Sequence, residues 1–334
     1  MAHNITEKDS LAYHGETPWH GIGKQLTALQ TADQMIIEAG LTWTVKRVPL
    51  YLKDDVQGDV PVSDFVGIRR EDTGDVLGVV TERYHPIQNS QAFEMVDALV
   101  TEGQAVIEVA GSIREGRMVW ALAKLPDIYE VVKGDAVQPY FLLAWGHDGK
   151  HGIAGKLTPV RVVCNNTLTA ALGDKWSSGA DIYVKHSAQA SIRIAEAQHA
   201  LGLVRMQTRE TLAAYRQLAG ISLTEDKAGA YFTGLFPEPV AGQEESAGAF
   251  EHRMVDYRDR HARLLRLYQY GAGNDTVGVA GTAWAAYNAV TDYLDHVYPV
   301  TKNGKVSTVR QESVLFGSKA AIRSDALQNA LALS

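Results

Sequence analysis

The chain has 334 residues, enough for about two domains, and its 46% hydrophobic and 21% charged residues are ordinary for a soluble protein. Its formal charge of −7 argues against a globally basic, chromatin-like binder, although local patches rather than net charge hold phosphates. The single cysteine excludes an internal disulfide and a thiolate zinc cluster. No apolar run could span a bilayer and the N-terminus lacks the regions of a signal peptide, so we expect a cytoplasmic protein.

Residues 1–26 are expected to form an N-terminal arm. The segment 14–23 holds two histidines and a glutamate, which are residue types that bind metals. However, Pro18 and the glycines of this segment prevent the helix that would align such ligands one turn apart. We prefer the interpretation that Trp19 anchors the arm on the body of the protein or on a neighbouring subunit, and we predict no metal site.

Residues 27–185 are predicted to form an α+β domain in which antiparallel hairpins pack on helices. Thr31 and Gln34 form a capping box that begins a short helix, and a second helix follows Asn89. β-branched and aromatic residues predict further elements, namely a strand at 42–48 and hairpins at 64–80, at 105–123 and in the first part of 140–173. Consecutive hairpins indicate a largely antiparallel sheet rather than a doubly wound one.

The stretch 140–173 is the part around which this domain is organised. Asp148 and Gly149 suit a tight hairpin turn between its two strands. The second strand carries Lys156 and Arg161, and a helix is predicted to begin directly after it, with its N-cap among three polar residues: Asn165, Asn166 and Thr167. A helix N-terminus beside two cations is a favourable site for a phosphate group.

The register of that second strand leaves two interpretations open. Lys156 and Arg161 are five residues apart, so an unbroken strand would place them on opposite faces. A one-residue bulge at Pro159 would bring both cations onto one face, where they could hold an anion together. The alternative is a half-exposed edge strand whose charges are merely solvated.

Residues 186–334 are predicted to form a mostly α-helical domain with a linker near 237–248. A basic helix at about 250–270 offers charge and stacking surface for nucleic acid through three residues at helical spacing: Arg253, Tyr257 and Arg260. The alternative is a solvated face packed at a subunit boundary, with Asp256 and Asp259 as the partners of these cations. Three cations on strands complete the candidate nucleic-acid-binding set: Arg69, Arg70 and Arg117.

The single cysteine raises the alternative of an enzyme with a thiol nucleophile. Cys164 lies beside the predicted helix N-terminus, whose dipole can activate a thiol. No spacing assigns a histidine as its base, and a cysteine after two valines is more often a small core residue. The chain has no phosphate-loop motif, no Gly-x-Ser-x-Gly elbow and no cluster of carboxylates for a metal nuclease. We therefore assign no catalytic residue, metal or cofactor.

Four segments in order along the chain together resemble one family. They are Trp19 to Gly23 (WHGIG), Arg161 to Leu168 (RVVCNNTL), Ala283 to Thr291 (AWAAYNAVT) and Ser313 to Ser318 (SVLFGS). The family is the phage/plasmid-like protein family built on domain of unknown function 932, and the resemblance spans nearly the whole chain. It implies an origin in a mobile element, whether phage, prophage or plasmid, and therefore a place in the cytoplasm of the bacterial host, but it implies no reaction.

A further, fold-level analogy concerns the single-strand annealing proteins of phages, similar in kind to the Rad52 and Red-beta groups. Hairpins followed by helices, with cations on strands, resemble their plan of a basic groove in a ring or helical oligomer. We therefore expect a non-catalytic, homo-oligomeric protein that binds single-stranded nucleic acid, with strand annealing in recombination as the specific role. The alternatives are a cysteine-dependent enzyme of unknown substrate and a phage structural or host-inhibiting protein.

Overall fold

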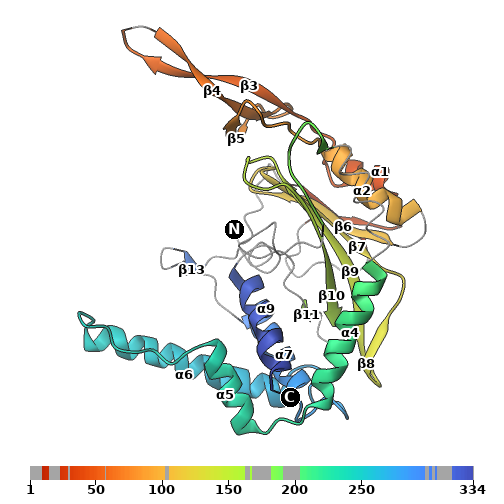
Figure 1. The fold of residues 1–334 in the computed structure, drawn as a ribbon, viewed down its shortest axis with the longest axis vertical. Helices are drawn as coiled ribbons and strands as arrows, with labels where there is room; N and C mark the ends of the chain where they lie inside the picture. The colour runs from red at the N-terminus through yellow and green to blue at the C-terminus, as the bar shows by residue number, and fades with distance from the viewer. Residues whose placement is uncertain are drawn as a thin grey trace. The chain divides into compact units, whose positions relative to one another are not determined.

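The computed structural model has an α+β fold, as the sequence predicts, and Figure 1 traces its elements along the chain. The residues that it describes are 10–14, 23–28, 31–56, 58–101, 105–161, 166–167, 182–190, 204–297, 301–302, 305–306 and 318–333. The chain divides into two compact units, each built from separate stretches of sequence. The first unit holds Met1–Pro126, Tyr140–Leu157 and Lys175–Arg205, and the second unit holds Asp127–Pro139, Thr158–Asp174 and Met206–Ser334.

The largest sheet has nine strands within the described residues, in the order β11-β10-β9-β7-β6-β1-β2, while β12 pairs with β10 and β8 with β9. These strands are β1 (Leu11–His14), β2 (Lys24–Leu26), β6 (Val106–Ile113), β7 (Met118–Lys124), β8 (Tyr129–Val132), β9 (Asp135–Gly146), β10 (Ile153–Arg161), β11 (Asn166–Thr167) and β12 (Ile182–Val184). β7 runs antiparallel to both β6 and β9, which confirms the hairpin predicted at 105–123. Residues 141–146 of β9 are all buried, as expected for a central strand covered on both faces.

The first unit contains a second sheet of three strands, which we call the arm sheet. Its order is β3-β4-β5, and its strands are β3 (Val45–Asp54), β4 (Gly58–Arg70) and β5 (Val76–Thr81). Figure 1 shows β3 and β4 as a long two-stranded ribbon. The strand predicted at 42–48 and the hairpin predicted at 64–80 are both present, but β3 and β4 extend further and pair with each other. Pro49 and Pro61 hid this pairing, because proline is expected to interrupt a central strand.

Two helices of the first unit, α1 (Ala32–Glu38) and α2 (Asn89–Thr101), pack on each other and against β6. The predicted capping box is confirmed: the Gln34 N–H donates to Thr31 Oγ1 at 3.2 Å, and the Thr31 N–H donates to Gln34 Oε1 at 3.1 Å. The core beneath these helices is apolar and aromatic. In it the Phe93 ring meets the Trp145 ring edge-on, with 5.6 Å between centroids.

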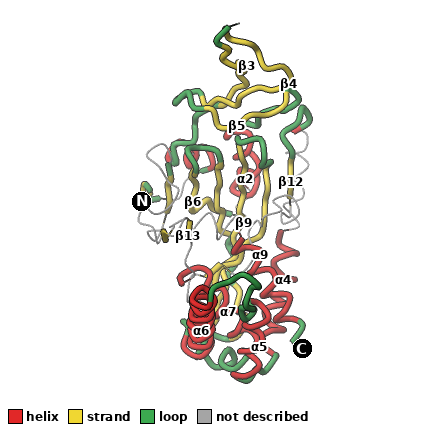
Figure 2. Tube along the Cα trace, turned by 90° about the vertical axis from the view of Figure 1, so that its left-hand side faces the viewer, coloured by secondary structure: helices red, strands yellow, loops and turns green. Residues whose placement is uncertain are grey.

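The second unit is mostly helical, and Figure 2 shows its helices in red. Its elements are α4 (Val204–Gly220), α5 (Glu225–Leu235), α6 (Ala247–Tyr270), α7 (Ala283–Asp292), the π-helix η2 (Tyr293–Val297), the short strands β13 (Thr301–Lys302) and β14 (Lys305–Val306), and α9 (Ser318–Leu331). Every residue of α7 from Ala283 to Thr291 is buried. In this core the Trp284 indole N–H donates to Asp135 Oδ2 at 2.6 Å, and the Tyr215 ring lies 4.9 Å from the Trp284 ring.

A single buried carboxamide, that of Asn89, connects three parts of the first unit. Its Oδ1 accepts hydrogen bonds from Trp145 Nε1 and His147 Nε2, both at 2.9 Å. Its Nδ2 donates to the carbonyl oxygens of Leu41 at 3.0 Å and Trp43 at 3.3 Å. The end of β9, the first residue of α2 and the segment before β3 therefore meet at one side chain, which is 1% exposed.

The turn between β9 and β10 is a six-residue loop at 147–152, not the tight turn predicted at Asp148 and Gly149. The Asp148 carboxylate organises it: Oδ1 accepts the N–H groups of Lys150 at 2.9 Å and His151 at 3.2 Å, and Oδ2 lies 2.8 Å from His151 Nδ1. Gly149 has a φ of +79°, and a Cβ added there would lie 2.3 Å from Val80 Cγ1. The loop therefore packs directly on strand β5 of the arm sheet.

A buried histidine, His147, and a half-buried one, His186, bracket this loop, and their surroundings keep each ring neutral. His147 is fully buried; its Nε2 donates to Asn89 Oδ1, and its Nδ1 has no hydrogen-bond partner among the described residues. His186 Nδ1 accepts the Ile87 N–H at 3.1 Å, so its Nε2–H donates to the His151 carbonyl at 3.1 Å. Burial is the main cause that lowers the pKa of His147 to about 3 and that of His186 to about 4.

The first prediction concerns the Asn89 carboxamide. Asn89→Ala leaves two buried N–H donors and two carbonyl oxygens without their partner, and a lost buried partner costs about 1–3 kcal/mol. We expect the free energy of unfolding to fall by about 2–4 kcal/mol in urea titrations, with secondary structure retained at low urea. Ser90→Ala, at the exposed neighbouring position, serves as the control. A change below about 1 kcal/mol in Asn89→Ala would contradict the role of this carboxamide as a connecting group.

The second prediction concerns pH. The pKa of His147 is lower in the folded state than the value of about 6.5 in the unfolded chain, so its contribution is complete above pH 6.5 and is lost as the pH falls from 6.5 toward 3. Between pH 7.5 and 5.5 this residue alone should remove on the order of 1 kcal/mol of stability. His147→Gln should be less stable at pH 7.5 but should lose less on acidification. Equal pH slopes in the two proteins, measured by urea titration, would refute the assignment.

Candidate nucleic-acid interface

The predicted phosphate site lies only partly within the described residues. Lys156 is half-buried on β10, in the first unit, whereas Arg161 is the last residue of the same strand and belongs to the second unit. Asn166 and Thr167 form the short strand β11, in which Asn166 pairs with Arg161 across an antiparallel ladder. The structure therefore places a strand at Asn166 and Thr167, where the sequence predicted a helix N-cap. Asn165, Cys164 and the predicted helix after them lie outside the described residues.

Arg70, predicted as a ligand-binding cation, is 5% exposed and is bound within its own unit. Its Nε and Nη2 donate to the two carboxylate oxygens of Asp72, at 2.7 and 2.9 Å, and its guanidinium lies 4.3 Å from the centre of the Trp43 ring. The hydrogen bonds from Arg70 are the main cause that lowers the Asp72 pKa. Because both its edge and its face are occupied, we leave Arg70 out of the interface.

Arg117 and Arg69, the other two strand cations of the predicted set, differ in their surroundings. Arg117 reaches the edge of β5, where Nε donates to the Leu77 carbonyl at 3.2 Å and Nη2 to the Val76 carbonyl at 3.4 Å. It also forms an ion pair with Glu115 at 3.2 Å, so its role is to connect β7 to the arm sheet. Arg69 is exposed on β4, and it lies opposite Lys46 in the β3–β4 ladder.

The helix predicted to be basic is α6, and it begins at the N-cap Ser246, whose side chain accepts the Ala249 N–H at 3.2 Å. The three residues predicted to bind nucleic acid lie on the side that contacts its neighbours. Arg253 forms an ion pair with Glu245 and donates to the Val240 carbonyl at 3.0 Å, both in the loop before the helix. This pair, chiefly through its hydrogen bond, raises the Arg253 pKa.

Tyr257 and Arg260 face the preceding helix, α5, and its end. The Tyr257 hydroxyl lies 3.3 Å from Thr233 Oγ1, and the Arg260 guanidinium lies 5.3 Å from the centre of the Phe236 ring. The predicted face therefore holds the helix in place. The recorded partners of these cations come from the loop and from α5, and not from Asp256 and Asp259 as the alternative interpretation expected.

A different face of α6 is exposed and carries two further arginines and a tyrosine. Arg263, Arg266 and Tyr270 follow one another at i, i+3 and i+7, a spacing that places them on one side of a helix. Tyr270 is 76% exposed, and within the described residues Arg263 and Arg266 form no hydrogen bond or ion pair. Earlier turns of this side carry Asp256 and Asp259, so its basic and aromatic character is confined to the last two turns.

Two buried residues explain why the sequence indicated the wrong side of the helix. Leu264 is fully buried and Tyr268 is 5% exposed, with its hydroxyl donating to the Leu223 carbonyl. Arg260 lies one turn and Tyr257 two turns before Leu264 on the same side, so they must pack as well. The apolar character of Leu264 and Tyr268 was the available signal, and helical spacing then places Arg263 and Arg266 away from them.

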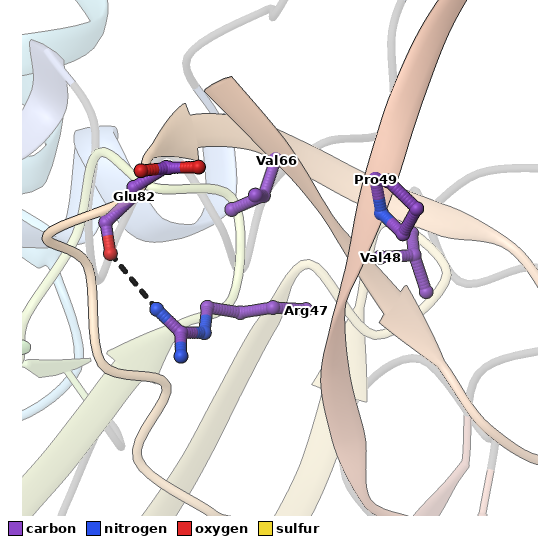
Figure 3. A pocket seen from close by; sticks show the side chains of 5 residues that line it. All are labelled: Arg47, Val48, Pro49, Val66 and Glu82. Carbon is purple, nitrogen blue, oxygen red and sulfur yellow. Dashed lines mark hydrogen bonds between the residues drawn. The ribbon is translucent and has the colours of Figure 1, made fainter. Parts of the chain in front are cut away.

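Other polar features of the described residues carry no site. A hollow of about 410 Å³ lies at the arm sheet, and Figure 3 shows the residues that line it: Arg47, Val48, Pro49, Val66 and Glu82. In it Arg47 Nη1 donates to the Glu82 carbonyl at 2.8 Å, which leaves one cation and one acid at an open surface. No group of three or more His, Cys, Asp or Glu placed to hold a metal occurs in the part of the chain that the structure describes, and no helix there could cross a membrane.

Comparison with known proteins gives one match. No curated protein and no solved structure matches the chain. A family model described as a domain of unknown function, DUF932, matches residues 76–316, which is more than two thirds of the chain and includes parts of both compact units. The match includes β5, the long strands β9 and β10, and the helices from α4 to α7. The chain therefore belongs to the DUF932 family.

Proposed function

We propose that this protein binds single-stranded nucleic acid and that the last two turns of α6 form part of its interface. One observation carries the proposal: Arg263 and Arg266 lie on the same side of the helix as Tyr270, which is 76% exposed. Arginine supplies charge and bidentate donors for phosphate groups, and an exposed aromatic ring supplies a surface on which a base can stack. A surface that combines the two suits a strand whose bases are unpaired.

The geometry of the helix limits the size of this contact. Because an α-helix rises about 1.5 Å per residue, Arg263 and Tyr270 are about 10 Å apart along the axis. One copy of this surface can therefore hold only a few nucleotides. A chain with a net charge of −7 needs such local surfaces, and several of them, to hold a long strand.

A second contact is proposed at the start of β11. Arg161 and Asn166 are direct partners in the β10–β11 ladder, so a cation and an amide donor belong to neighbouring positions of one sheet edge. Phosphate oxygens accept hydrogen bonds from both residue types. Lys156 and Arg69, half-buried and exposed respectively, are strand cations of the first unit that we retain as separate candidate contacts.

We further propose that the protein serves a phage or plasmid and acts in strand annealing. The support is the resemblance of the four quoted segments to phage/plasmid-like proteins, together with the antiparallel hairpins packed on helices. Annealing requires that two strands be presented together, which several copies of a short contact surface would achieve. The proposal requires no catalytic residue, and Cys164 has no part in it.

The third prediction tests the α6 surface. Arg263→Ala/Arg266→Ala should weaken binding to a fluorescent oligo-dT and lower the slope of log affinity against log salt by about 1.4, because each lost phosphate contact on a single strand removes about 0.7. Tyr270→Ala should weaken binding by about 5- to 150-fold, which corresponds to a stacking contribution of about 1–3 kcal/mol, while Tyr270→Phe should keep most of the affinity. Fluorescence anisotropy between 50 and 300 mM salt measures both quantities.

The matched control is Arg258→Ala, which removes an exposed arginine from another side of the same helix, where it pairs with Glu251 at 3.2 Å. It should change the salt slope much less than Arg263→Ala does. Equal effects of Arg258→Ala and Arg263→Ala would show general electrostatic attraction instead of a defined surface. Wild-type protein that does not bind single-stranded DNA or RNA at 50 mM salt would refute the proposed function.

A further inference from the structure

One face of the arm sheet is apolar and exposed, although the opposite face already supplies the core of the first unit. Val45, Ile68 and Val80 lie on the inner face and are buried. Cross-strand partners share a face, so the pairs Val48–Gly67 and Gly67–Val79 lie on the outer one. We call this outer side the open face; its centre consists of Val48, Leu50, Leu52, Phe65, Val76 and Val79.

The open face is a continuous surface and not a set of scattered residues. A Cβ added to Gly67 would lie 3.1 to 3.5 Å from side-chain atoms of Val48, Leu50 and Val76, so these three side chains converge over the glycine. Around them Leu52 is 65% exposed, Val79 57%, Phe65 46% and Val76 44%. A sheet with one solvated face normally carries polar residues there. An exposed apolar surface of this extent marks a contact with another molecule.

Side chains cover part of both edges of the arm sheet and hinder contact by strand addition there. At the β3 edge, the backbone N–H and carbonyl of Val45 that point away from β4 are bound by Gln88. Its Oε1 accepts the Val45 N–H and its Nε2 donates to the Val45 carbonyl, both at 3.0 Å. The backbone nitrogen of Pro49, four residues further along β3, also points away from β4, and it has no N–H that a new strand could bind. At the other edge, Arg117 donates to carbonyl groups of β5. Side chains thus hinder strand addition at part of each edge, and the exposed apolar face offers a partner the larger contact.

The charges that β3 carries on the open face indicate which kind of partner would fit it. On the open face β3 presents Lys46, three apolar residues and then Asp54, which is a pattern with opposite charges at its two ends. A two-fold axis at Leu50 places Lys46 against Asp54 of a second copy, and Val48 against Leu52. Arg69, the cross-strand neighbour of Lys46, adds to the basic end, where Glu71 holds Lys46 at 2.8 Å. Asp55 adds to the acidic end.

We propose that the open face is the interface of a homodimer in which two arm sheets pack face to face with their β3 strands antiparallel. A two-fold contact of this kind uses the same patch on both copies, which requires a self-complementary surface. Stacked sheets lie about 10 Å apart with strands nearly aligned, which lets the apolar side chains of the two copies interdigitate. The inference goes beyond the proposed function, because the apolar residues of the open face, Lys46 and Asp54 have no part in the nucleic-acid interface; Arg69 is the one residue that both surfaces use.

The fourth prediction compares two neighbouring exposed residues on opposite faces of the arm. Leu52→Glu places a charge in the centre of the proposed interface, whereas Tyr51→Glu places the same charge on the other side, where Tyr51 is 57% exposed. In sedimentation velocity of the full chain, Leu52→Glu should raise the dimer dissociation constant at least 100-fold, and Tyr51→Glu should change it less than 3-fold. Circular dichroism should show both variants folded, because both positions are exposed.

A charge exchange tests the antiparallel arrangement itself. Lys46→Glu and Asp54→Lys should each weaken the dimer, because each creates two like-charge contacts across the axis. A mixture of these two variants should form a heterodimer in which both contacts are again attractive, and the double variant should form a homodimer of nearly wild-type affinity. Lys46→Glu also places a second carboxylate beside Glu71, but both positions are exposed, so the change should have little effect on folding.

The outcomes separate the arrangement from its alternatives. Dimers lost in Leu52→Glu and restored in the charge-exchange mixture would establish the contact. A wild-type protein that is monomeric at 50 µM, or whose assembly Leu52→Glu leaves unchanged, would overturn it. Restoration in the double variant without restoration in the mixture would also overturn it, because the two residues would then interact within one chain. None of these results depends on nucleic-acid binding.

Discussion

The buried carboxamide of Asn89 is the contact on which the arrangement of the first unit depends. One side chain satisfies two donors, an indole and an imidazole, from the end of β9 and two carbonyl groups from the segment before β3. That segment leads straight into the arm sheet, and Asn89 itself begins α2. The main sheet, the helical layer and the arm sheet therefore share one polar anchor, a buried carboxamide whose oxygen and nitrogen each take part in two hydrogen bonds.

Local signals in the sequence predicted local structure well. Thr31 and Gln34 begin α1 as a capping box, and Asn89 begins α2, because each signal involves atoms a few residues apart. The loop at 147–152 was different. Asp148 and Gly149 favoured a two-residue turn, but the Asp148 carboxylate binds the two N–H groups that follow and widens the turn onto β5. That outcome depends on a distant strand, which spacing alone does not reveal.

On helix α6, too, the sequence did not reveal which neighbouring elements each side of the helix contacts. Spacing grouped Arg253, Tyr257 and Arg260 correctly, since the three do share a side of α6. It did not show that α5 and the preceding loop lie against that side, because these contacts are made only in the folded unit. An arginine can bind a ligand only where no other group of the protein already occupies its guanidinium. The α6 residues retained for the interface, Arg263, Arg266 and Tyr270, are thus those that the packing of Leu264 and Tyr268 leaves exposed.

The capped edges of the arm sheet have a consequence for a chain that is still being synthesised. Arg117 follows β5 by about 40 residues in the sequence, so the outer edge of this strand emerges before its cap exists. Pro49 is part of β3 itself and protects that edge from the moment the strand forms. Nascent chains expose unpaired strand edges to one another and can aggregate through them. Pro49 therefore interrupts the edge of β3 as soon as that strand forms, whereas the edge of β5 stays uncapped until Arg117 has been made.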